Sequence, residues 1–331
     1  MTKLKIFSQG DVKQAVNMSQ AIDAVKGAYI QLSRGEAVIP LRTQVPVKKQ
    51  DAVTLFMPAY LASTDTLAVK VVSVFPNNTE KELPTIHAVV ILINAQTGQS
   101  EALMDGTYLT ALRTGAASGL ATDFLARKDA RVAAIFGAGT QGRTQLEAVS
   151  TVRTIEKAWV YDIIPERAET YIKEMKSRGH PIPYDLSIAR TASQAVRDAD
   201  IICTATTSLT PVFDDIDLKP GAHINAVGSY TPQMQEIPAQ TVAKAKVVVD
   251  SISASLTEAG DLIIPLKDRI ITKSHIHGEI GQVAAGEIPG RERDEELTLF
   301  KSVGVAAQDA AVAQLVLHRA EELGLGTDID L

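Results

Sequence analysis

The stretch that decides the fold of this chain is Val132-Ala133-Ala134-Ile135-Phe136-Gly137-Ala138-Gly139-Thr140-Gln141-Gly142. The leading apolar residues predict a strand buried on both faces, and the glycines predict a turn into a helix that begins near Thr140. Gly137 permits the tight turn, Gly139 lets the backbone approach a pyrophosphate, and Gly142 lets the helix pack close to the strand. Because a lone G-x-G-x-x-G motif also occurs in ordinary strand-turn-helix units, dinucleotide binding needs a second signal.

That signal is an acidic residue at the end of the next predicted strand. Residues 158–162, Ala-Trp-Val-Tyr-Asp, predict a strand that ends in Asp162. An acid at this point of a strand-helix-strand unit accepts the ribose hydroxyls of an adenosine, so the whole pattern predicts dinucleotide binding. We expect NAD, because Asp162 would repel a 2′-phosphate. NADP stays an alternative, since Arg167 could swing across to the same place.

From residue 130 onward the pattern alternates strand and helix. Predicted strands begin near Arg131, Lys157, Ser187, Ala199, Ala222 and Lys246, which is the six-strand count of a doubly wound parallel sheet. The fourth strand is followed by Thr204, Ala205 and Thr206, at the switch point where the second half of the cofactor is expected. An ordinary loop of small residues is the alternative for this segment.

The N-terminal half has a different pattern of apolar and polar residues. Residues 17–35 predict an amphipathic helix, and a mixed sheet is predicted from the strand-like segments 52–57, 67–74, 86–94 and 100–104, with a hairpin turn at 95–98. A helix rich in small residues is predicted over 105–126. A last helical pattern, from Val305 to Val316, is predicted to return to this half of the chain.

Composition excludes several classes of protein. The chain has 331 residues, 45% of them hydrophobic and 22% charged, which is typical of a globular protein with a sizeable core. A net charge of −6 without a basic run argues against nucleic acid and anionic membranes as partners. The single cysteine, Cys203, excludes an intrachain disulfide. No signal peptide or membrane span is apparent, so we expect a cytoplasmic protein.

Three cations in the N-terminal half stand in unusual surroundings. Lys70 interrupts an apolar strand, Arg113 lies among small, core-like residues, and Arg42 follows Pro40-Leu41. Buried cations need anionic partners, which are either carboxylates of the protein itself or the carboxylate of a substrate. Asp309, on the predicted inner face of the last helix, is a candidate functional residue and equally a candidate structural partner of Arg113.

Several motifs together resemble the ornithine cyclodeaminase/mu-crystallin family. They are Pro40-Leu41-Arg42, Phe56-Met57-Pro58, the strand around Lys70, Leu83-Pro84-Thr85, residues 107–115 (T-Y-L-T-A-L-R-T-G), the glycine loop 137–142, Val227-Gly228-Ser229 and residues 300–304 (F-K-S-V-G). The resemblance covers nearly the whole chain. It implies a homodimeric enzyme with a substrate-binding and dimerisation α+β domain, residues 1–126 and 304–331, and a Rossmann NAD-binding domain, residues 127–303.

The resemblance also implies roles for particular residues. Arg42, Lys70 and Arg113 would hold the carboxylate of an amino or imino acid against the nicotinamide, with Met57 and Tyr230 as further substrate contacts. Lys70, Arg113 and Asp309 would be catalytic. The cofactor contacts would be Thr85, Gly137, Ala138, Gly139, Thr140, Gln141, Gly142, Asp162, Arg167, Thr204, Ala205, Thr206, Val227, Gly228, Ser229 and Ser302.

Two departures from the family pattern help to choose an activity. Cyclodeaminase members carry an aspartate and a glutamate where this sequence has Tyr230 and Leu55. A cyclodeaminase needs a carboxylate to move protons between amines, whereas a tyrosine, with a reference pKa near 10, is a poor base at neutral pH. We therefore expect a reductase of a small 2-imino acid, such as pyrroline-2-carboxylate, iminosuccinate or the imine of pyruvate. An ornithine cyclodeaminase and a non-catalytic binding protein of the mu-crystallin type are the alternatives.

One further cluster imitates a metal site. Ser274-His275-Ile276-His277 is followed by Glu279, but this spacing on a predicted loop lacks a third well-placed ligand. We expect a hydrogen-bonded loop and no metal.

Overall fold

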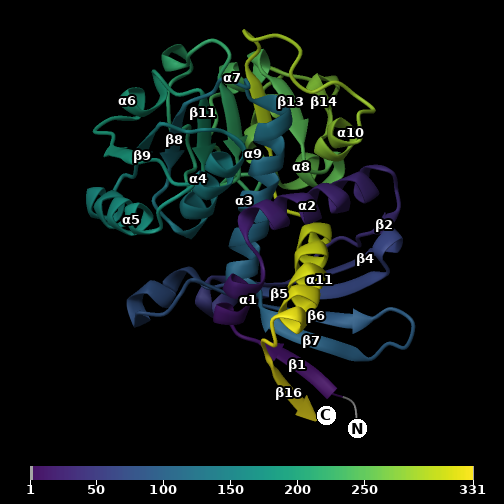
Figure 1. Cartoon of the computed structure of the whole chain (residues 1–331). Helices are drawn as coiled ribbons and strands as arrows, with labels where there is room; N and C mark the ends of the chain where they lie inside the picture. Colours follow the sequence, from purple (N-terminus) through teal and green to yellow (C-terminus); the bar gives the residue numbers. More distant parts are fainter. Residues whose placement is uncertain (1–2, 331) are drawn as a thin grey trace. The chain divides into compact units, whose positions relative to one another are not determined.

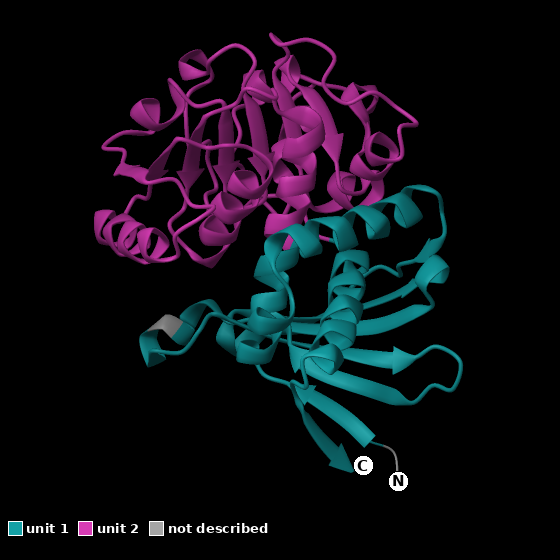
Figure 2. Cartoon of the chain, in the orientation of Figure 1, with its two compact units in different colours: residues 1–113, 305–331 teal, residues 114–304 magenta. Residues whose placement is uncertain are grey.

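The computed structural model describes residues 3–330, which form two compact units (Figure 2). One unit comprises residues 1–113 and 305–331, and the other comprises residues 114–304. The division falls inside helix α3 (Gly106–Leu125), between Arg113 and Thr114, whereas the predicted domain boundary follows residue 126. The predicted roles of the two domains stay predictions, and residues 1, 2 and 331 lie outside the described part.

Residues 114–304 are built on a parallel sheet of eight strands (Figure 1). Their order is β10-β9-β8-β11-β12-β15-β13-β14. The bounds are β8 Val132–Phe136, β9 Lys157–Tyr161, β10 Asp185–Ile188, β11 Ile201–Thr204, β12 His223–Ala226, β13 Lys246–Val249, β14 Ile276–Glu279 and β15 Thr298–Lys301. The predicted doubly wound parallel sheet is confirmed, because the order reverses direction between β8 and β11.

The predicted count of six strands is wrong. The six predicted strands are present, but β14 and β15 add two more, and β15 lies between β12 and β13. Both were missed because neither has a run of apolar residues: β14 carries His277 and Gly278, and β15 ends in Lys301. The predicted loop around His277 is therefore a strand.

Helices cover both faces of this sheet. They are α4 Thr140–Val152, α5 Pro165–Ser177, α6 Ala192–Val196, α7 Ala239–Lys244, α8 Ile252–Glu258, α9 Gly260–Lys267 and α10 Ile280–Ala284. Alternate residues of β8 belong to different cores: Ala133 and Ile135 pack with Leu146 of α4, whereas Ala134 and Phe136 belong to the core on the opposite face. The unbroken apolar run of β8 follows from burial on both sides.

The other unit contains a mixed sheet. Its strand order is β16-β1-β7-β6-β5-β4-β2, with β3 also paired to β4. The bounds are β1 Lys3–Phe7, β2 Ala37–Val38, β3 Thr43–Val47, β4 Ala52–Leu61, β5 Thr66–Val74, β6 Ile86–Asn94, β7 Ser100–Asp105 and β16 Thr327–Asp330. The predicted mixed sheet and the hairpin turn between β6 and β7 are confirmed.

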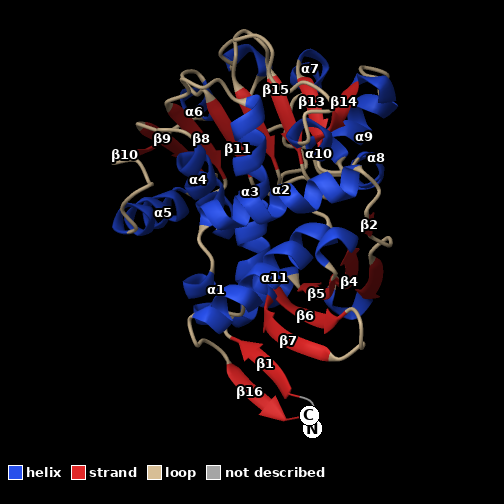
Figure 3. Cartoon of the chain, turned by 45° about the vertical axis from the view of Figure 1, so that its right-hand side comes forward, coloured by secondary structure: helices blue, strands red, loops and turns tan. Residues whose placement is uncertain are grey.

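Three helices pack with this sheet, as Figure 3 shows in blue. They are α1 Gln9–Ala15, α2 Met18–Ser33 and α11 Ala306–Glu322. Asn17 caps α2 by accepting the backbone N–H of Gln20 at 3.0 Å, which explains where that helix begins. The predicted return of the last helix is confirmed, since α11 packs on β4, β5 and β6 and against α2.

Strand register decides which side chains lie under α11. Met57, Lys70, Val90 and Met104 are cross-strand neighbours in one row, and all four are buried. The opposite face carries Phe56, Pro58, Tyr60, Leu67, Val69, Val71, Val89, Ile91, Ile93 and Leu103, none of which is fully buried in the chain. We call these ten residues the open face. No described helix is long and apolar enough to cross a membrane.

Candidate active site

Lys70, Arg113 and Asp309 meet in a buried ion-pair cluster. The Asp309 Oδ2 atom lies 2.7 Å from Lys70 Nζ, and Asp309 Oδ1 lies 3.0 Å from Arg113 Nε. The three residues come from β5, α3 and α11, and each is at most 6% exposed. One carboxylate therefore faces two buried cations, so the trio carries an excess of positive charge in a place with little water.

Gln308 orients the arginine of this cluster. Arg113 Nη1 donates to Gln308 Oε1 at 2.9 Å, and the same oxygen accepts the backbone N–H of Val305 at 2.9 Å. The Gln308 side-chain amide in turn donates to the carbonyl of Arg113 at 3.3 Å. The guanidinium plane is thus held from the first turn of α11. We did not predict Gln308, although its place beside Asp309 is a signal that could have found it.

The surroundings of Lys70 change its acidity. Burial lowers the pKa of Lys70 to about 8, Asp309 opposes this shift, and the positive charges of Arg113 and Arg42 reinforce it. Arg42 immediately precedes β3, and the joint role predicted for these three cations stays a prediction. Met57 is the direct cross-strand neighbour of Lys70 on the buried face. A lysine with this pKa can both bind an anion and release a proton near neutral pH.

The glycine loop forms an open cradle. Gly137 has φ +96°, and an added Cβ there would lie 2.6 Å from the Ala205 carbonyl oxygen. A Cβ on Gly142 would lie 2.1 Å from the carbonyl oxygen of Gly137, so the helix can approach the strand only without a side chain. At Gly139 a Cβ would meet no atom within 4 Å, which leaves room for a bound group beside the backbone. These are the three properties expected of a pyrophosphate loop.

Asp162 lies beside this cradle and supports it. One oxygen accepts the backbone N–H of Ala138 at 2.9 Å, and the other accepts the N–H of Ile164 at 2.9 Å. A cavity of about 480 Å³ opens here, and its lining includes Gly139, Asp162 and Arg167 as well as Thr206 from the loop after β11. The structure thus brings together the acid, the arginine, the glycine loop and the loop after β11, all of which the sequence assigned to the cofactor.

The remaining predicted residues lie in three places. Thr204 ends β11, Thr206 follows it, and Gly228 and Ser229 follow β12; all four donate to one buried carboxylate, that of Glu236. Ser302 donates to Asp250 at 2.8 Å. Tyr230, 42% exposed, follows Ser229 in the loop after β12, and Thr85 immediately precedes β6. The ligand roles of all these residues stay predictions.

The two histidines of the metal-like motif contact carbonyl groups. His275 Nε2 lies 2.7 Å from the carbonyl oxygen of Val242, and His277 Nε2 lies 2.9 Å from that of Pro289. Both contacts are structural ones, between the segment around β14 and its neighbours.

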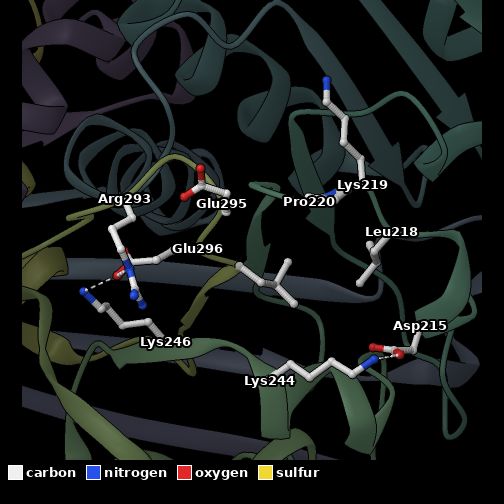
Figure 4. Close-up of a pocket in the computed structure, with 10 residues that line it drawn as sticks. Asp215, Leu218, Lys219, Pro220, Lys244, Lys246, Arg293, Glu295 and Glu296 are labelled. Carbon is white, nitrogen blue, oxygen red and sulfur yellow. Dashed lines mark hydrogen bonds and ion pairs between the residues drawn. The ribbon is translucent and has the colours of Figure 1, made fainter.

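A second cavity, of about 600 Å³, is a weaker candidate (Figure 4). It lies at the ends where β12, β13 and β15 begin, away from the glycine loop. Its cations are already matched by carboxylates: Lys244 pairs with Asp215, Lys219 with Asp200, and Lys246 with Glu292 at 2.7 Å and Glu296 at 3.3 Å. This balance of charge leaves no excess to attract an ionic ligand.

Comparison with known proteins agrees with this geometry. The model of the "Ornithine cyclodeaminase/mu-crystallin family" matches residues 3–324. The chain belongs to this family. Among family members, the Delta(1)-pyrroline-2-carboxylate reductase of Bacillus cereus is 40% identical over 326 residues, 98% of this chain and 99% of the relative.

Two solved structures of family members are similar over their full length. The Delta(1)-pyrroline-2-carboxylate reductase of Thermococcus litoralis, in complex with NADH and L-proline, is 45% identical with a TM-score of 0.94, covering 98% of this chain and 100% of that one. An archaeal alanine dehydrogenase dimer with bound NAD is 34% identical with a TM-score of 0.92, covering 100% of both chains.

Proposed function

We propose that this chain is an NAD(P)H-dependent oxidoreductase that reduces the C=N bond of a small 2-imino acid to the amino acid. The observation that carries the proposal is the buried cluster in which Lys70 and Arg113 share the single carboxylate of Asp309. A substrate carboxylate would balance the excess positive charge of this cluster. The pyrroline-2-carboxylate reductases and the alanine dehydrogenase among the relatives support the same class of reaction.

Each residue of the cluster has a proposed task. Arg113, with its plane held by Gln308, would bind the substrate carboxylate through two parallel hydrogen bonds, and Arg42 would add a second positive charge. Asp309 would keep the Lys70 ammonium oriented. Lys70, with a pKa of about 8, would donate the proton that the imine nitrogen needs when C2 is reduced. A bound water is the alternative proton donor.

The proposed cofactor is NAD, held by the glycine loop and Asp162. When bound, NADH supplies a hydride to C2 of the imino acid. The cradle at Gly137, Gly139 and Gly142 fits a pyrophosphate, and Asp162 fits the ribose hydroxyls. NADPH stays possible because Arg167 lines the same cavity as Asp162.

The proposal includes a homodimer formed through the mixed sheet. The open face consists of ten apolar or aromatic residues, and Phe56 and Val89 are each 40% exposed in the single chain. Apolar patches of this kind are usually covered by a partner, and two-fold dimers are the commonest assembly. The dimeric alanine dehydrogenase relative supports this assembly.

We also propose that residues 1–126 with 304–331 bind the substrate, and that the enzyme acts in the cytoplasm.

A screen of NADH oxidation tests the proposed reaction. Purified protein is mixed with NADH and, in turn, pyrroline-2-carboxylate, iminosuccinate, or pyruvate with ammonia, and the loss of NADH absorbance is followed. Ornithine with NAD serves as the control for cyclodeaminase activity. We expect turnover of at least one imino acid and no ammonia from ornithine. Faster ammonia release from ornithine would establish the lyase instead, and NADH binding without any turnover would indicate a binding protein.

A further inference from the structure

Glu236 is a fully buried carboxylate that collects hydrogen bonds from two separate loops. Its Oε1 atom accepts from the backbone N–H of Thr206 at 2.6 Å and from the Thr206 hydroxyl at 2.7 Å. Its Oε2 atom accepts from the Thr204 hydroxyl at 2.9 Å, the N–H of Gly228 at 2.8 Å and the N–H of Ser229 at 3.2 Å. One side chain therefore ties residues 204–206 to residues 227–229.

These two loops lie at the part of the sheet where the second half of a dinucleotide belongs. They follow β11 and β12, which are neighbours in the sheet. The glycine loop and Asp162 follow β8 and β9, on the other side of the point where the strand order reverses. Because a dinucleotide spans that point, its adenosine half belongs over β8 and β9 and its nicotinamide half over β11 and β12.

A second buried acid and a buried lysine hold Glu236 in place. The backbone N–H groups of Glu236 and Ile237 donate to Asp261 Oδ1 at 2.7 and 3.0 Å. The other oxygen of Asp261 lies 3.0 Å from Lys301 Nζ, and both side chains are completely buried. Lys301 ends β15, the neighbour of β12. The arrangement connects the ends of three adjacent strands through charged groups.

The packing around the Glu236 carboxylate leaves no room for an additional side-chain atom. A Cβ on Gly228 would lie 2.4 Å from Glu236 Oε1 and 2.3 Å from the Thr206 carbonyl oxygen. Any side chain at this position would push the two loops apart. Burial and the charge of Asp261 raise the pKa of Glu236, while Lys301 opposes the shift. Burying an acid is costly, and at this site the cost is offset by the five hydrogen bonds that the Glu236 oxygens accept.

We propose that Glu236 is a positioning residue, which sets the spacing of loops 204–206 and 227–229 and thereby orients the nicotinamide half of the cofactor. Asp261 and Lys301 hold Glu236 at the required place. The inference rests on the proposed binding of NAD and is independent of which imino acid is reduced. It predicts that the Glu236 carboxylate matters more for the nicotinamide half than for the adenosine half, although Thr206 also lines the cavity at Asp162.

Glu236→Gln tests this split, because the amide keeps the size of the side chain but turns one acceptor into a donor that faces N–H groups. Dissociation constants are measured by calorimetry for NADH and for ADP-ribose, which lacks the nicotinamide. We expect the value for NADH to rise about 10- to 100-fold. The value for ADP-ribose should rise much less, by about threefold, because Thr206 is the one donor to Glu236 that lines the cavity at Asp162.

The adenosine side keeps its own supports in this variant. The segment after Thr206 stays attached through backbone hydrogen bonds, from Gln235 N to the Ser208 carbonyl at 3.2 Å and from Val212 N to the Glu236 carbonyl at 2.9 Å. Glu147→Gln is the matched control: Glu147 is partly buried in α4 and pairs with Arg178 at 3.3 Å. Neither ligand should bind differently to this control.

Gly228→Ala is a second variant, which displaces the same loops while leaving the carboxylate intact. Its dissociation constant for NADH should rise in the same way, and more than that for ADP-ribose. An equal loss of affinity for both ligands, or an unchanged affinity for NADH, would overturn the inference. Failure of both variants to fold would assign Glu236 to folding alone and overturn it as well. A wild-type chain that binds neither ligand would instead remove the proposed NAD site on which the inference rests.

Discussion

Lys70 is a lysine in the middle of an apolar strand, and its acidity leads to a prediction about pH. Its pKa of about 8 means that the ammonium form, which binds the carboxylate and donates the proton, predominates below that pH and is lost above it. We expect kcat/KM for imine reduction to fall as pH rises through about 8. Over the same range, kcat/KM for the reverse oxidation should rise. Initial rates across this range test the prediction.

The control for this pH profile is Lys70→Arg. An arginine stays protonated throughout the range, so the variant should be slower but should lose the step near pH 8. An unchanged step in the variant would assign the titration to another group.

Arg113 has both a proposed substrate contact and an observed structural one. Arg113→Lys keeps the charge but loses the planar two-point grip, so we expect kcat/KM for the imino acid to fall about 10²-fold while NADH affinity is unchanged. The lost hydrogen bond to Gln308 should also lower the melting temperature by about 2–4 °C, corresponding to about 1 kcal/mol. Steady-state kinetics and thermal melts measure the two effects separately.

Arg319→Lys is the matched control, because Arg319 lies on α11, is partly exposed and pairs with the nearby Glu322 of the same helix. It should leave kcat/KM unchanged. If Arg113→Lys melts early yet keeps wild-type kcat/KM, Arg113 is a structural residue and the substrate carboxylate must be held by Arg42 and Lys70.

At the scale of elements, the unit β8, glycine loop, α4 and β9 determines the choice of cofactor. Asp162 ends this unit and also holds the loop through the N–H of Ala138. Asp162→Ser removes the charge that opposes a 2′-phosphate, so the preference for NADH over NADPH in kcat/KM should narrow. NADH itself should bind less tightly, because the loop loses an anchor. A wild-type preference for NADPH would refute the assigned role of Asp162.

At the scale of the whole molecule, the open face predicts self-association. Val89→Lys places a charge in the middle of this face, next to Asp105 on β7, so the single chain should tolerate it while a dimer interface should not. Sedimentation velocity at micromolar concentration should show a dimer for the wild type and a monomer for the variant. Ile216→Lys, at a 91% exposed position outside the open face, should remain dimeric. A monomeric wild type would contradict the proposed assembly.

The sequence by itself determined those features whose signal is clear within a few neighbouring residues. The glycine loop, the hairpin turn between β6 and β7, the helices α2, α3 and α11 and six strands of the parallel sheet could be predicted, because each has its signal within a few neighbouring residues. The cations Lys70 and Arg113 could be singled out for the same reason, since a charge within an apolar or small-residue pattern is visible in one window.

Only the tertiary structure decided which of these groups meet. The place of β15 between β12 and β13, the carboxylate of Asp309 between Lys70 and Arg113, and the two loops gathered on Glu236 all join segments that are far apart in the chain. Periodicity describes which face of an element is buried but carries no information about its neighbours. The partners of a buried charge are chosen when sheets and helices pack, and that choice made a lysine, an arginine and an aspartate into one site.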